Sequence, residues 1–329
     1  MRIHLLAISI LGTLCAFGRQ SYSLVADGKT ETYTLIQQSG FYPETSGNTT
    51  PDEFMCHPEY PHISQVWDDD LNKYVFAFDI HIDFDQDGQS VTDGNKSSLS
   101  DRQRNEIKCM SDKEGTVAKD GESITYSWKF KLPEGMLTTK EFCHIHQIKG
   151  MGDGEEVAHP VFTLTCRTTT SRQVLQVINV PYEGSANVNI AQIDLLPLLG
   201  KWIMATETIT VGQHGKYSLK LSDLNTGESL VSVDKDDIQV YRFTTDESTM
   251  RGKWGIYRSL GSDLNLKDQL QSERLLFADF EVKKENAAVN EIYSGENMYE
   301  EPYYDLMGRK VENPTRGIYI RKGEKIYIK

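Results

Sequence analysis

Hydrophobic and polar residues alternate with a period of two through most of this chain, from about residue 60 to residue 284. The alternation is clearest over residues 76–84 and 124–132, where large apolar side chains take every second position. Successive side chains of a β-strand point to opposite faces of its sheet, so this pattern predicts strands that bury one face. Further runs of this kind are residues 161–165, 174–180, 202–211, 217–221, 240–243, 254–257 and 275–282.

Turn sequences separate these runs and leave little room for helices. Helical patterns are short and occur only around residues 193–199 and 264–270. Many antiparallel strands with almost no helix predict an all-β protein, and the size of this region suits a jelly-roll β-sandwich. Turns rich in Gly, Asp and Asn, the residues that tight turns favour, lie at residues 87–88, 93–94, 120–121, 153–154 and 225–227.

The overall charge limits the classes of ligand. The 329-residue chain has a formal net charge of −13. An extended surface for nucleic acid needs a basic face, so the charge argues against nucleic acid as a partner. An acidic ligand would have to bind in a local basic cleft. No apolar run is long enough to span a bilayer, so we expect no transmembrane segment. We also expect a monomeric protein.

The first residues have the pattern of a secretion signal. Arg2 and His4 precede an apolar run over residues 5–17, which is too short for a membrane anchor. We therefore expect residues 1–23 to be a removed signal peptide, and the mature protein to be secreted or held at the cell surface. Two alternatives stay open: a lipoprotein attached at Cys15, for which the preceding residue is a poor fit, and a buried N-terminal helix.

Four cysteines remain after such a signal: Cys56, Cys109, Cys143 and Cys166. An even number in an exported protein permits two disulfides, with three possible connectivities. No Cys-x-x-Cys pair is present, which argues against a structural zinc site. Buried free thiols are an equal alternative, because cysteine is among the most buried residue types.

A change of composition after residue 284 marks a domain boundary. Residues 24–284 would form the sandwich, and the polar residues 285–303 are typical of a linker. Residues 304–329 then contain a Tyr-Asp-Leu-Met-Gly-Arg-Lys-Val sequence, an Asn-Pro-Thr-Arg-Gly-Ile-Tyr-Ile strand and a Lys-rich end. This tail resembles the C-terminal sorting domain of the type IX (Por) secretion system. The resemblance implies transport across an outer membrane, with the secretion machinery as the partner of the tail. The alternative is a small hairpin of the main sandwich.

Three charged strands are candidates for a functional site, and the first covers residues 101–108. In a strand, Arg104, Glu106 and Lys108 share one face. Arg102 lies just before them. Charged side chains are costly to bury without partners. This face is therefore either a solvated outer surface or a ligand-binding face, in which Glu106 holds the basic groups and Arg104 grips a carboxylate.

The second strand, residues 143–150, carries two of the eight histidines of the chain. Regular alternation puts His144 and His146 on one face and turns Gln147 and Lys149 to the other. The pair could ligate a metal, but no third ligand is evident nearby. The histidines could equally be structural, or the strand could line an active site with Gln147 and Lys149 facing the ligand.

The third strand is residues 253–258. Lys253, Gly255 and Tyr257 share one face, and Arg258 follows. A glycine at this position leaves room for a ligand or another backbone to approach closely. Basic groups near Tyr257 would stabilise its phenolate, as a proton-transfer residue requires. The alternative is a tyrosine with its ring in the core and its hydroxyl in water.

Together the three strands resemble those of the jelly-roll polysaccharide lyases, above all the alginate lyase family and, more distantly, heparin lyase I. These lyases carry an R-x-E-x-R strand, a Gln-Ile-His-Gly strand and a K-x-G-x-Y strand, in this chain order. The resemblance spans about residues 60–284. It implies β-elimination across a uronic acid of an acidic polysaccharide, with no cofactor required. One position departs from the family pattern, because Lys149 stands where these lyases usually have His.

The resemblance also implies a role for each residue. Tyr257 is expected to transfer the proton, with His144 or His146 as the alternative base if a bulge turns it inward. Gln147 and Arg104, with Lys149, are expected to bind the uronate carboxylate and stabilise the developing enolate. Contacts to the rest of the substrate are expected from Arg102, Glu106, Lys108, Lys253 and Arg258.

A fourth motif, residues 83–88, resembles a calcium loop. Asp83, Asp85 and Asp87 alternate ahead of a glycine, as the oxygen ligands of calcium do. The twelfth position, which is Glu in an EF-hand, is Gly94 here, and no helix flanks the loop. The motif is either a structural calcium site or a solvated acidic turn.

Two other functions stay open. A non-catalytic carbohydrate-binding (lectin-like) or adhesion module uses the same sandwich, but it needs exposed aromatic residues on its concave face. A glycoside hydrolase of this fold uses paired carboxylates, and no E-x-D-x-x-E strand supplies them. The lyase interpretation requires Arg104, Gln147 and Tyr257 to lie in one groove.

Overall fold

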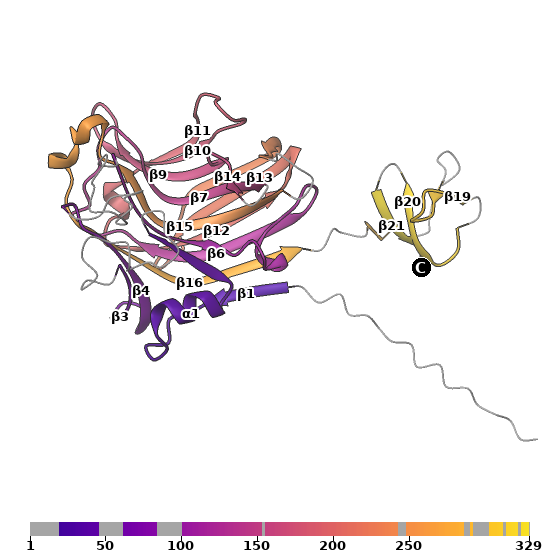
Figure 1. The fold of residues 1–329 in the computed structure, drawn as a ribbon, viewed down its shortest axis with the longest axis horizontal. Coiled ribbons are helices and arrows are strands. Elements are labelled where there is room, and N and C mark those ends of the chain that lie inside the picture. Colours follow the sequence, from indigo (N-terminus) through magenta and orange to yellow (C-terminus); the bar gives the residue numbers. More distant parts are fainter. Residues whose placement is uncertain are drawn as a thin grey trace, which may run out of the picture.

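The computed structural model describes residues 20–45, 62–83, 101–152, 155–242, 248–285, 290–291, 303–311, 314–321 and 324–328. Within them, two antiparallel sheets of eight strands each form a β-sandwich (Figure 1), so the prediction of an all-β jelly-roll sandwich is confirmed. Strands that are neighbours in a sheet are often far apart in the sequence, as crossovers between the two layers require.

Sheet A contains the longer strands of the sandwich. Its order is β14 (Ser229–Val240), β13 (Gly212–Asp223), β12 (Trp202–Thr210), β6 (Ser123–Lys131), β16 (Glu273–Glu285), β4 (Lys73–Ile80) and β3 (Ile63–Asp68), with β1 (Gln20–Leu24) paired to β16.

Sheet B carries the three charged strands near its middle. Its order is β11 (Val188–Asp194), β10 (Gln173–Asn179), β9 (Phe162–Thr168), β7 (Cys143–Gly152), β15 (Thr249–Ser259), β5 (Arg102–Cys109) and β2 (Phe41–Thr45), with β8 (Glu155–Glu156) paired to β7.

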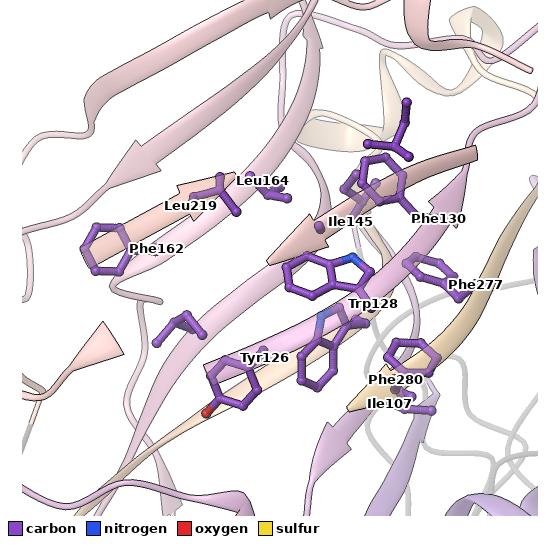
Figure 2. Close-up of a cluster of buried hydrophobic side chains, with 14 of the residues drawn as sticks. Ile107, Tyr126, Trp128, Phe130, Ile145, Phe162, Leu164, Leu219, Phe277 and Phe280 are labelled. Atoms are coloured by element: carbon purple, nitrogen blue, oxygen red, sulfur yellow. The ribbon is translucent and has the colours of Figure 1, made fainter. Parts of the chain in front are cut away.

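The hydrophobic core lies between the two sheets. β6 shows the alternation most clearly, since every second side chain from Ile124 to Phe130 is fully buried. Figure 2 shows Trp128 in a cluster of buried side chains that also contains Phe277 and Phe280 of β16. Burying one such side chain contributes roughly 1.5–3 kcal/mol. The core therefore fixes which face of each strand turns inward, and with it which face is left for a site.

Helices are few, as expected, but they do not lie where the sequence suggested. The two helical patterns form only single 3₁₀ turns, η2 (Leu196–Leu198), η3 (Ser262–Leu264) and η4 (Lys267–Gln269), and η1 (Glu114–Thr116) is a fourth such turn. The one α-helix of the described residues, α1 (Thr32–Gln38), was not predicted, because Ile36 is its only buried residue and gives no periodic signal. No helix within the described part of the chain has the length and apolar character to span a membrane.

The N-terminal boundary needs a correction. β1 pairs with β16 residue by residue, from Gln20 opposite Lys284 to Leu24 opposite Phe280. Removing residues 1–23 would delete four of the five residues of this strand. A leader that is removed without damage to sheet A would therefore have to end before Gln20.

Three of the four candidate disulfide cysteines are free thiols. Cys109, Cys143 and Cys166 are buried and unbonded, and Cys56 lies outside the described residues. Burial raises the pKa of the Cys109 and Cys143 thiols to about 12. The alternative of buried thiols therefore holds for these three residues, and the expected pair of disulfides is not formed.

The C-terminal residues form a sheet of their own rather than a hairpin of the sandwich. Its buried residues are Tyr303 and Ile326. The first of these precedes the predicted start of the tail by one residue. The strands, in sheet order, are β17 (Asn290–Glu291), β21 (Glu324–Ile328), β20 (Gly317–Arg321), β18 (Tyr303–Tyr304) and β19 (Lys310–Val311).

Candidate active site

Three strands of sheet B bring most of the predicted residues onto one face. β15 lies between β5 and β7, and its register with β5 places Tyr257 opposite Arg104 and Lys253 opposite Lys108. The alternating residues of these strands, such as Ile107, belong to the core between the sheets. The charged residues therefore occupy the outer face of sheet B, which we call the groove face.

Gly255 lies where the backbone of β15 comes close to that of β5. Its φ is +145°, and a Cβ at this position would lie 2.1 Å from the carbonyl oxygen of Asn105. L side chains rarely adopt this backbone conformation. The glycine thus makes room for a neighbouring backbone rather than for a ligand, which decides between the two alternatives left open by the sequence.

A bulge in β7 separates the two histidines. Between His144 and His146 the register advances two residues on β7 but only one on β9, so Ile145 is an extra residue. The bulge turns His144 to the groove face with Gln147 and Lys149, and it turns His146 inward. The prediction that the two histidines share a face is therefore wrong, because it assumed regular alternation.

His146 is an interior residue. Its Nδ1 lies 2.8 Å from the carbonyl oxygen of Lys253, and its Nε2 lies 2.7 Å from Glu207 of β12 in sheet A. Its ring packs against Trp128 and Trp254. These contacts are structural, which corrects the prediction of a catalytic role for His146.

Arg258 also points away from the groove face. Its Nε and Nη2 donate hydrogen bonds of 2.8 and 2.6 Å to Oε1 of Gln103, and the residue is 1% exposed. Arg258 follows Tyr257 directly, so alternation gives it the opposite face. The prediction that it binds substrate is therefore wrong.

Lys253 lies at the centre of a buried ion-pair cluster. Its Nζ is 2.7 Å from Glu44, 3.3 Å from Glu156 and 3.6 Å from Glu106. Burial would lower the pKa of Lys253, but these three carboxylates raise it. Lys253 and Glu106 have no exposed surface, so they hold the groove face together from beneath. This corrects the prediction that these two side chains contact the substrate.

Glu44 and Glu156 link the remaining bases to this cluster. Glu44 lies 2.7 Å from Nη1 of Arg104 and 3.0 Å from Nζ of Lys108, and Glu156 lies 3.3 Å from Nζ of Lys149. Burial would raise the pKa of both carboxyl groups. The neighbouring ammonium and guanidinium groups outweigh it: they lower the pKa of Glu156 to about 2 and hold that of Glu44 well below its ordinary range.

A pocket of about 350 Å³ opens beside the cluster, on the groove face. Five of the predicted residues line it: Arg102, His144, Gln147, Lys149 and Tyr257. Gln147 is anchored from below, because its Nε2 donates a 2.6 Å hydrogen bond to Glu106. The bulge in β7 and the glycine in β15 together bring these side chains to one cavity.

Tyr257 is held between two arginines at the wall of this pocket. Arg102 donates a hydrogen bond of 3.3 Å from Nη1 to the phenol oxygen. The guanidinium of Arg104 lies over the ring, 3.9 Å from its centroid. Phe142 and His144 flank the tyrosine, with ring centroids 5.1 and 6.0 Å away. The phenol oxygen is therefore fixed in place and already has a charged donor beside it.

Two other groups in the pocket have lowered pKa values. Burial, followed by the charges of Arg167 and Lys149, lowers the pKa of His144 to about 3, so its ring is neutral at neutral pH. Its Nδ1 lies 2.8 Å from the hydroxyl of Thr165. Burial and the charge of Lys253 lower the pKa of Lys149. Loss of the proton from Lys149 is therefore easier than in water.

A second cavity, of about 450 Å³, lies on the groove face, across the ion-pair cluster from the first pocket. It is lined by Lys108, Glu44 and Glu156, together with Tyr42 and Arg251. Lys108 is the predicted binding residue nearest this cavity, and its side chain is partly exposed. A polymer that filled both cavities would cross the ion-pair cluster.

The sequence argument missed several groove residues, among them Glu44, Glu156, Thr165 and Arg167. β9 carried a usable signal, because its apolar residues alternate with Thr163, Thr165 and Arg167. β2 and β8 carried none. β2 is short and contains a proline, and β8 has only two residues, so neither shows a period.

The calcium motif is described only in part. Asp83 is exposed and pairs with Nζ of Lys267 at 3.0 Å, whereas Asp85 and Asp87 lie outside the described residues. No group of three His, Cys, Asp or Glu side chains suited to a metal occurs among the residues that the structure describes. The calcium site stays a prediction.

Comparison with known proteins gives structural neighbours only. No family model matches the sequence, and no curated protein matches it either. An alginate lyase from Aplysia kurodai is 11% identical and covers 80% of this chain and 97% of that chain, with a TM-score of 0.48. An endo-β-1,4-glucuronan lyase from the fungus Trichoderma reesei is 13% identical, with 67% and 86% covered and a TM-score of 0.42. An alginate lyase from Pseudomonas aeruginosa is 13% identical, with 69% and 88% covered and a TM-score of 0.42. These likenesses concern the fold alone.

Proposed function

We propose that this protein is a polysaccharide lyase, which cleaves a uronic-acid-containing acidic polysaccharide by β-elimination. One observation carries the proposal: a single pocket brings together a tyrosine held by two arginines, a neutral histidine, an amide and a lysine with a lowered pKa. A net charge of −13 makes a basic pocket on this protein a local and specific feature.

The reaction needs two kinds of group. The C5 proton of a uronate is weakly acidic, so its carboxylate must be neutralised before a base can remove the proton. The electron pair of the C5–H bond then forms the C4–C5 double bond, the C4–O4 bond breaks, and the leaving oxygen takes up a proton. Lys149 and Gln147 are suited to the carboxylate, because one offers a charge and the other an amide donor.

Tyr257 is suited to the proton transfer. Its phenol oxygen lines the same pocket, and the Arg102 guanidinium would stabilise that oxygen as it gives up its proton. His144 is the alternative base, since its ring stays neutral and keeps a lone pair. Arg104 acts on the tyrosine rather than on the carboxylate, because it stacks on the ring and pairs with Glu44.

A glycoside hydrolase is less well supported. Its general acid must hold a proton near neutral pH, which requires a carboxyl group with a raised pKa. Glu44 and Glu156 both have lowered pKa values, so these groove carboxylates stay ionised. They serve as partners of the bases and are poorly placed to donate a proton.

A panel of acidic polysaccharides, monitored by ultraviolet absorbance, tests the proposal. Elimination creates a conjugated unsaturated uronate, which absorbs in the ultraviolet, whereas hydrolysis creates reducing ends without that absorbance. The panel should include polymers of mannuronate, guluronate, glucuronate and iduronate. A rise in absorbance with at least one polymer supports the lyase. Binding without cleavage of any polymer would favour the lectin-like module, and reducing ends without absorbance would favour a hydrolase.

We also propose that the protein is exported and that residues 304–329 act as the sorting signal. The separate C-terminal sheet and its Lys-rich end support this proposal. Deleting residues 304–329 should stop release from the cell and leave the purified sandwich active. Equal release of the truncated and intact proteins would contradict the sorting role.

A structural calcium ion at residues 83–88 stays part of the proposal, and chelation should then lower the melting temperature.

A further inference from the structure

A row of polar side chains on β9 extends the wall of the pocket beyond the residues considered so far. Thr163, Thr165 and Arg167 alternate with three core residues, so all three face the groove side. Thr165 pairs in register with His144 and bonds its ring. Thr163 and Arg167 both line the 350 Å³ pocket. The position of Arg167 places a guanidinium next to the proposed proton-transfer groups.

Arg167 differs from the other bases of the groove in its partners. Arg104 and Lys108 pair with Glu44, and Lys149 and Arg251 pair with Glu156. The side chain of Arg167 makes no hydrogen bond or ion pair with any residue that the structure describes, and its buried Nε has no acceptor.

Among the described residues, Glu141 is the carboxylate whose charge raises the pKa of Arg167, and it does not offset the burial that lowers this pKa. A half-buried guanidinium without a partner carries a desolvation cost that an anion would offset.

The two residues assigned to carboxylate binding each have a partner within the protein already. Gln147 donates one N–H to Glu106, and Lys149 pairs with Glu156. A planar guanidinium binds a carboxylate or a sulfate through two parallel hydrogen bonds. The guanidinium of Arg167 is not taken up by any residue that the structure describes, and it can make such a contact from the pocket wall.

We propose that Arg167 binds an anionic group of the polysaccharide, a carboxylate or a sulfate ester, in the pocket beside His144 and Tyr257. The residue thereby makes the site specific for polymers that carry an anion at this subsite. The inference rests on the proposed function for the identity of the ligand, and it concerns binding rather than turnover. A charge-assisted contact of this kind changes affinity by roughly 10- to 100-fold.

Binding of defined tetrasaccharides to four proteins tests the inference: the intact protein, Arg167→Gln, Arg167→Lys and Arg172→Gln. Arg172 is a matched control, because it follows β9 at the surface, pairs with Asp194 and does not line the pocket. The probes are a mannuronate tetrasaccharide, a chondroitin sulfate tetrasaccharide and neutral cellotetraose. Titration calorimetry gives the affinities, and a melting curve checks the folding of each variant.

Arg167→Gln should weaken the binding of an acidic probe by roughly 10-fold or more, and Arg167→Lys should recover part of that loss. Arg172→Gln should bind like the intact protein, and binding of the neutral probe should not respond to Arg167. Equal losses for both acidic probes would identify the carboxylate as the ligand, and a loss for the sulfated probe alone would identify the sulfate. The inference fails if folded Arg167→Gln binds both acidic probes as tightly as the control, or if the intact protein binds neither.

These outcomes are separate from the fate of the proposed function. If no polymer is eliminated but Arg167→Gln still loses affinity, the lyase proposal fails and the anion subsite stands. If a polymer is eliminated and Arg167→Gln keeps both its affinity and its KM, the lyase proposal stands and the subsite fails.

Discussion

The polar residues on the two faces of β7 differ in their hydrogen-bond partners. On the interior face, both ring nitrogens of His146 have partners, one of them Glu207 from the other sheet. On the groove face, His144 touches a threonine, and Arg167 beside it has no partner within the described residues. Buried polar groups that keep a fold together have their hydrogen bonds satisfied. Burial therefore does not distinguish a site from a scaffold here, whereas the partners of these two side chains do: His146 is bonded to both sheets, and Arg167 lines a pocket without a partner among the described residues.

The largest effect on stability is expected on the interior face. Glu207→Ala would leave His146 without its partner from sheet A, and removing one partner of a buried pair costs about 3–5 kcal/mol. The free energy of unfolding, measured with urea, should fall by that amount. Glu228→Ala changes an exposed glutamate of the same sheet region and should have almost no effect. Equal stability of the two variants would mean that the interior pair is not structural.

A smaller effect is expected at the ion-pair cluster of the groove face. The pKa of Glu156 is about 2 in the folded protein and 4.5 in the reference state, so its ionised form stabilises the fold above pH 4.5. This stabilisation, on the order of 3 kcal/mol, is lost as the pH falls from 4.5 toward 2. Glu156→Gln should therefore be less stable than the intact protein at pH 7, and the difference should shrink in this window. A difference that is constant with pH would show that the charge of Glu156 is not what stabilises the fold.

The smallest effect, over the window from pH 6.5 to 4.5, concerns His144. Its pKa is lowered from 6.5 to about 3, so below pH 6.5 the unfolded chain binds a proton that the folded protein does not. Stability should decrease as the pH falls below 6.5, by up to about 1.4 kcal/mol per pH unit from this residue. His144→Gln should remove that part of the slope between pH 6.5 and 4.5, and His214→Gln, at an exposed histidine, should not. An unchanged slope in His144→Gln would place the acid sensitivity elsewhere.

Much of the fold could be predicted because alternation depends only on which face of a strand is buried. The run over residues 124–132 is an example, since β6 covers residues 123–131 and buries the expected side chains. Helix α1 gave no signal because it buries a single residue. β1 was hidden inside the predicted leader, because four of its five residues lie before the expected end of the leader, after residue 23.

The site was harder to predict for a specific reason. Regular alternation placed Tyr257, Arg104 and Lys149 on the faces that the structure gives them. It also placed both histidines on one face, but one extra residue in β7 puts them on opposite faces. A bulge shifts every later residue by one position and leaves no mark in a single sequence. The partners Glu44 and Glu156 come from strands too short to show a period, and only the folded sheet brings them to Lys253.

Tyr257→Phe tests the central claim most directly, because it removes one hydroxyl and keeps the ring beneath Arg104. We expect the rate of unsaturated uronate formation to fall by roughly 10²-fold or more, the usual contribution of an acid–base group. The melting temperature and the affinity for an acidic tetrasaccharide should stay unchanged, because the packing and the bases of the pocket remain. A Phe variant that forms unsaturated uronate at the rate of the intact protein would contradict the account and move the proton transfer to His144 or Lys149.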